Sequence, residues 1–139
     1  MKLALLVVER TGVPVGVETA AANVPEVRLA GPVLASIPEG VGVPWDVPLV
    51  ADRGYDSDPL RERLARDGYR LLAPHRKNRT RPPVNDGRRM RRYRRRYVVE
   101  RTIGWLHSYR RVLVRHEWWE FLYHGFVQLA CTFIALSRL

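Results

Sequence analysis

The apolar positions at the start of the chain alternate in a way that predicts a β-hairpin. Residues 2–8 are apolar and partly β-branched, residues 10–12 form a turn signal, and residues 13–19 carry valine at every second position up to Val17. Two such runs joined by a short turn are typical of a hairpin. Residues 25–48 contain five prolines and three glycines. Only short elements fit there, and we expect one helix over residues 26–37, interrupted at Pro32.

A strand, a helix and a second strand are predicted next. Apolar runs at residues 47–51 and 69–73 indicate two short buried strands, with a helix over residues 59–67 between them. Ser57 or Asp58 can cap this helix, and a proline and a glycine stand at its two ends. Strands and helices that alternate in this way favour an α/β layer fold.

The C-terminal third is predicted to be helical. One strongly helical stretch runs over residues 89–111, and a last helix runs over residues 118–139. The apolar segment 121–136 contains four interrupting residues and is shorter than the ~20 residues of a membrane-spanning helix. We therefore interpret it as a packed core helix that includes Cys131, and expect no membrane association.

The aromatic residues at the start of the last helix have two interpretations. Trp118, Trp119 and Phe121 could anchor this helix in the core, or they could form a platform for stacking bases. The core interpretation is favoured, because large aromatic side chains near an apolar helix usually pack inside.

Positive charge is concentrated in one stretch of the chain. Residues 76–116 hold 15 basic and 2 acidic side chains, in a chain of 139 residues with net charge +10. Eight arginines and no lysine occupy residues 88–96 and 101. The planar fork of arginine matches phosphate, so contact with nucleic acid is favoured over a merely solvated surface. A single cysteine excludes a disulfide or a cysteine zinc site within one chain, and a cytosolic setting fits best.

Two carboxylates are candidates for chemistry. Asp52 follows an apolar strand, where open α/β sheets place their ligands. Asp56 and Asp58 could join it around a cation, but we expect them to be turn and cap residues. Glu100 is the only acid between residues 87 and 116. It either pairs with a nearby arginine in a structural salt bridge or is a second metal carboxylate facing Asp52.

Helical geometry places further polar side chains near Glu100. At about 100° per residue, four side chains share one narrow helical face: Tyr93, Arg96, Glu100 and His107. In the functional interpretation, Tyr93 and Arg96 position a phosphate beside the two carboxylates.

Two motifs resemble one known family. Residues 50–57, VADRGYDS, resemble the ADKGYDS strand end of the DDE transposases of bacterial insertion sequences, specifically insertion-sequence families four and five. Residues 96–106, RYVVERTIGWL, are similar to that family's R-W-V-V-E-R-T-F-x-W-L helix. The family signature Y-x2-R-x3-E-x6-K reads here Tyr93, Arg96, Glu100 and His107, with histidine in place of the final lysine.

The resemblance implies a fold and a chemistry. It implies that residues 1–139 are a single partial DDE transposase catalytic domain, with an α/β, ribonuclease H-like (retroviral-integrase-like) core truncated at its N-terminus. Three carboxylates would hold two Mg2+ (or Mn2+) ions for attack on a DNA phosphodiester. Asp52 would be the second aspartate and Glu100 the glutamate. DNA at the element ends and the target would contact Tyr93, Arg96, His107, Arg88, Arg89, Arg92 and Arg95.

The first aspartate of the family is expected to be missing, because it precedes a hairpin like residues 2–17. The leading hypothesis is therefore a cytoplasmic, nucleoid-associated transposase that is active only when completed by an upstream-encoded half, so the isolated chain is expected to be inactive or weakly active. Its expected partners besides DNA are a second copy of itself or that upstream-encoded half. The alternative is a catalytically inactive DNA-binding remnant or regulator of transposition. A third interpretation, a basic RNA-binding protein, is disfavoured because RNA binding requires neither Asp52 nor Glu100.

Overall fold

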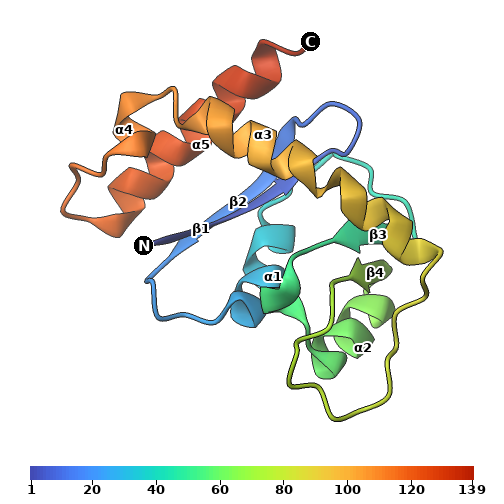
Figure 1. Cartoon of the computed structure of the whole chain (residues 1–139). Coiled ribbons are helices and arrows are strands. Elements are labelled where there is room, and N and C mark those ends of the chain that lie inside the picture. The colour runs from blue at the N-terminus through green and yellow to red at the C-terminus, as the bar shows by residue number, and fades with distance from the viewer. The chain divides into compact units, whose positions relative to one another are not determined.

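The computed structural model describes residues 1–139 and divides into two compact units (Figure 1). The first, which we call the hairpin unit, consists of residues 1–24, 28–39 and 97–139. The second, the strand–helix–strand unit, consists of residues 25–27 and 40–96. Each unit combines helices with one two-stranded sheet, so the chain is a mixed α/β protein.

The predicted hairpin is confirmed. Strands β1 (Lys2–Val7) and β2 (Pro14–Ala20) pair antiparallel. Gly12 in the connecting turn has φ +73, a conformation that favours glycine, and a Cβ there would lie 2.9 Å from Oγ1 of Thr102. The buried Thr102 hydroxyl donates a hydrogen bond to the Gly12 carbonyl at 2.6 Å. This bond ties the turn to the helix that carries Thr102.

Three helices pack beside the hairpin: α3 (Tyr97–Leu106), α4 (Arg110–Leu113) and α5 (Glu120–Leu136) (Figure 1). Helix α3 contacts β1, whereas α5 contacts β2 and both other helices. Their shared core consists of Val17, Leu106, Val112, Val127, Ala130, Cys131 and Ile134. The predicted burial of Cys131 is confirmed.

Helix α5 packs into the core, as predicted, but through one face only. Leu129, Phe133 and Leu136 are exposed on it. The prediction that the aromatic residues at its start are core anchors is wrong, because Trp118 and Trp119 are exposed. The reason is that α5 begins only at Glu120, so both tryptophans lie in the preceding loop. No helix combines the length and the apolar character needed to cross a membrane.

Helix α1 (Glu26–Ala35) occupies the region predicted as residues 26–37. Its buried residues Leu29 and Val33 pack with Ala4 of β1. Pro32 lies inside the helix and does not interrupt it, contrary to expectation. Pro32 lies on the exposed side, where water can satisfy the backbone carbonyl that loses its partner.

The strand–helix–strand prediction is confirmed. Strands β3 (Val47–Val50) and β4 (Tyr69–Leu72) pair parallel and are joined by α2 (Asp58–Arg66). Ser57 caps α2 by accepting a hydrogen bond from the Leu60 backbone N–H at 3.4 Å, and α2 packs against β4. Strand β3 is half-buried rather than buried.

The long helix predicted over residues 89–111 is not continuous. Arg89–Arg96 forms a 3-10 helix, η2, and the α-helical winding begins at Tyr97. In an α-helix each arginine side chain would lie beside those three and four residues away. In a 3-10 helix it lies beside those three residues away only, and the arginines are spaced farther apart along the helix axis. The helical face inferred for Tyr93 through His107 spans two windings and stays a prediction: Tyr93 and Arg96 lie on η2, Glu100 lies on α3, and His107 follows α3.

Candidate functional site

Asp52 directly follows β3, and its side chain organises the next turn. The Ala51 backbone N–H still donates to the Leu72 carbonyl of β4 at 3.0 Å, so the sheet extends to the residue before Asp52. Asp52 then caps the short 3-10 helix η1 (Arg53–Tyr55), with Oδ1 accepting from the Gly54 N–H at 2.9 Å. This bond uses one carboxylate oxygen.

Gly54 allows two carboxylate side chains to approach one another. A Cβ at this position would lie 3.0 Å from Asp52 Oδ1 and 3.1 Å from Cγ of Glu26. Any larger residue would therefore push against both side chains. Sequence reasoning assigned Glu26 only to the start of a helix, yet the structure places it beside Asp52.

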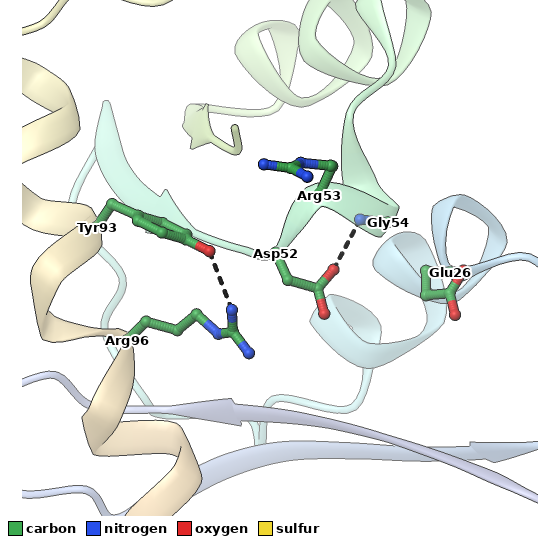
Figure 2. A pocket seen from close by; sticks show the side chains of 6 residues that line it. All are labelled: Glu26, Asp52, Arg53, Gly54, Tyr93 and Arg96. Carbon is green, nitrogen blue, oxygen red and sulfur yellow. Dashed lines mark hydrogen bonds between the residues drawn. The ribbon is translucent and has the colours of Figure 1, made fainter. Parts of the chain in front are cut away.

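A pocket of about 490 Å³ lies at this point within the strand–helix–strand unit (Figure 2). Figure 2 shows the Asp52 carboxylate between Glu26 on one side and the side chains of Tyr93 and Arg96 on the other. The lining residues are Glu26, Asp52, Arg53, Gly54, Tyr93 and Arg96. The pocket thus combines two carboxylates, which attract cations, with two guanidinium groups, which attract anions.

Tyr93 and Arg96 act as a pair on η2. Arg96 Nη1 donates a hydrogen bond to the Tyr93 hydroxyl at 3.0 Å, and its guanidinium carbon lies 5.9 Å from the Tyr93 ring centre. A 3-10 helix places residues three apart directly above one another. The winding of η2 therefore sets this pair, and both side chains are half-buried at the pocket wall.

Comparison with known proteins gives the family. The family model for the transposase DDE domain matches residues 1–133. The chain belongs to the transposase DDE domain family. It is 32% identical, over an alignment covering 96% of this chain, to a Burkholderia cepacia protein named "Putative transposase for insertion sequence element IS402". The chain spans 62% of the length of that relative. No solved structure matches it.

The other predicted residues of this DDE domain lie outside the pocket lining. Glu100 is exposed in the first turn of α3, in the hairpin unit, and His107 is exposed just after that helix. No group of three or more His, Cys, Asp or Glu side chains gathers where it could hold a metal ion. The remaining predicted DNA contacts are exposed along or just before η2: Arg88, Arg89, Arg92 and Arg95.

Asp56 and Asp58 belong to an ion-pair network and do not line the pocket. Asp56 accepts hydrogen bonds from Arg61 Nη1 at 2.6 Å, the Arg76 backbone N–H at 2.6 Å and His75 Nδ1 at 3.1 Å. Burial by itself would raise the pKa of Asp56, but these donors outweigh it and lower the pKa to about 2. Arg79 binds Asp58 through two bonds of 3.0 Å each. Both carboxylates therefore fix the loops beside α2.

Tyr55 is a partly buried phenol near the two carboxylates of the pocket. Burial, followed by the charges of Asp52 and Glu26, raises the pKa of Tyr55 to about 12. Because the pKa of Tyr55 is higher in the folded state than in the unfolded state, the protonated phenol favours folding. This contribution to stability is complete below the unfolded pKa of 10.0 and is lost as the pH rises through about 12.

We therefore expect Tyr55→Phe to reduce the alkaline loss of stability between pH 10 and about 12. Thermal melting of the two proteins across this range measures the effect. Tyr97→Phe removes an exposed phenol and is the matched control, which should keep the wild-type profile. Equal alkaline sensitivity in wild type and Tyr55→Phe would contradict the assignment.

Proposed function

We propose that this chain carries the metal-dependent catalytic chemistry of a DNA transposase, within a ribonuclease H-like core. The observation that carries the proposal is the pocket in which Asp52 lies with Tyr93 and Arg96. A carboxylate can bind a metal cation and a guanidinium can bind a phosphate, so the two groups in one cavity suit the cleavage of a phosphodiester bond. The family membership and the arginine-rich η2 support DNA as the substrate.

The donor set of the pocket fits a hard divalent cation. Asp52 and Glu26 offer carboxylate oxygens, which Mg2+ and Mn2+ prefer, and Gly54 leaves room beside them. Mg2+ commonly keeps several waters and needs few protein carboxylates. When bound, such an ion supplies an activated water or hydroxyl and neutralises developing charge on the phosphodiester.

Each protein side chain has a separate role in this proposal. Asp52 would hold the cation, and Glu100 would contribute a further carboxylate, as the family resemblance implies. Arg96 binds a non-bridging phosphate oxygen, and the Tyr93 hydroxyl orients that guanidinium. His107 and the exposed arginines before Tyr97 would contact the DNA backbone.

Nicking of supercoiled plasmid DNA with Mg2+ or Mn2+ tests the catalytic proposal. Asp52→Ala and Glu100→Ala are each expected to reduce nicking by at least about 100-fold, because a catalytic cation contributes several kcal/mol. Glu26→Ala tests the second pocket carboxylate and should raise the Mn2+ concentration that nicking requires. Glu62→Ala, an exposed acid on α2, is the matched control and should nick as wild type does. Undiminished nicking by Asp52→Ala would refute the assignment.

A second candidate function is DNA binding without cleavage. The observation that favours it is that no three metal-ligating side chains gather in the structure. A protein of this kind would bind plasmid DNA with strong salt dependence and leave it intact with either metal. Salt-sensitive binding without nicking in the wild-type chain would therefore select a regulator of transposition over the enzyme.

A further inference from the structure

The loop between α4 and α5 exposes large aromatic side chains to solvent. Trp118 is 85% exposed, Trp119 is 61% exposed and Phe121, in the first turn of α5, is 69% exposed. Each such ring carries a large apolar area that normally contributes to a core or an interface. Two adjacent exposed tryptophans therefore indicate a surface that binds a partner.

This loop is held in place by charged hydrogen bonds. The Glu117 side chain is only 6% exposed and forms an ion pair with Arg111 at 3.0 Å. Arg115 donates from Nε to the Glu117 carbonyl at 3.0 Å and from Nη2 to the Trp118 carbonyl at 3.1 Å. Arg115 also lies over the ring of Tyr123, 6.0 Å from its centre. The backbone that carries the tryptophans is thus fixed while their rings face solvent.

The charges around the rings favour an anionic partner. No acid occurs between residues 101 and 116, whereas Arg110, Arg111, Arg115 and His116 are exposed there. Glu117 is paired with Arg111, which leaves Glu120 as the acid adjoining the tryptophans. Exposed aromatic rings that follow a run of arginines suit single-stranded nucleic acid, because rings stack on bases while guanidinium groups meet phosphates.

We propose that the surface formed by Trp118, Trp119 and Phe121 stacks unpaired DNA bases, with Arg110 and Arg115 contacting the adjoining phosphates. This inference rests on the proposed function, from which it takes DNA as the ligand. Unpaired rather than duplex DNA fits, because bases inside a duplex already stack on one another and do not present their faces. The surface would recognise an opened or frayed DNA end.

The test measures binding of a fluorescent single-stranded oligonucleotide and of the matching blunt duplex to the full chain. The double variant W118A/W119A is expected to bind the single strand about 5- to 150-fold more weakly for each base that loses its stacking partner. Its affinity for the duplex should change little, and the salt dependence of binding should be unchanged because no cation is removed. Trp45→Ala removes another exposed tryptophan, in the strand–helix–strand unit, and is the matched control.

Specific outcomes overturn the proposal. If the wild type binds the duplex, and W118A/W119A binds the single strand with the same affinity as the wild type does, the stacking surface is wrong while DNA binding stands. If the double variant changes the sedimentation of the chain but not its affinity for DNA, the surface serves a second copy of the protein. If the wild type binds neither DNA, both this inference and the proposed function fail.

Discussion

Asp56→Ala is expected to destabilise the strand–helix–strand unit by about 3 kcal/mol, because it leaves Arg61 and His75 without their shared partner. The Asp56 side chain is only 4% exposed and joins α2, through Arg61, to the segment after β4, through His75 and Arg76. Urea denaturation followed by circular dichroism measures the loss. Glu62→Ala, on the exposed side of α2, should change stability by less than about 0.5 kcal/mol.

The same carboxylate predicts an acid transition. The pKa of Asp56 is lowered from 3.8 to about 2, so its contribution is complete above pH 4 and is lost as the pH falls through about 2. The Asp56→Ala variant should therefore lose less stability than wild type over this interval. Parallel acid profiles for the two proteins would show that the network does not hold this unit together.

Leu106→Ala is expected to destabilise the hairpin unit by about 2–5 kcal/mol, which is typical of truncating a buried leucine. Leu106 ends α3, is completely buried, and belongs to the core that includes residues of β2, α4 and α5. Thermal melting measures the effect. Leu136→Ala removes the same atoms from an exposed position on α5 and is the matched control.

The comparison of Leu106→Ala with Asp56→Ala also shows whether the two units unfold together. A single transition lowered by either variant means cooperative unfolding of the whole chain. Two transitions, each lowered by one variant, mean that the units unfold independently. A Leu106→Ala protein as stable as Leu136→Ala would contradict the described core.

Elements with strong local signals could be predicted from the sequence. The hairpin follows from valine alternation and a turn glycine, and α2 follows from Ser57 before the helix and Gly68 after it. These signals act within a few residues and need no tertiary information. The motif around Asp52 could likewise be found, because its residues are consecutive in the chain.

Features that depend on tertiary packing could not be predicted in this way. Glu26 meets Asp52 only because the chain folds back over 26 positions, and no local pattern marks it as a pocket residue. The exposure of Trp118 and Trp119 depends on where α5 begins and on the ion pair of Glu117. The hydrophobic pattern predicts that residues 89–96 are helical, but it does not distinguish the 3-10 winding of η2 from the expected α-helical winding.

That winding makes η2 longer than an α-helix of the same residues. A 3-10 helix rises about 2.0 Å per residue and an α-helix about 1.5 Å, so rewinding the eight residues Arg89–Arg96 would shorten them by about 4 Å. The greater rise spaces the arginines of η2 farther apart along its axis than an α-helix would, so η2 spans a longer stretch of a polyanion with the same number of guanidinium groups.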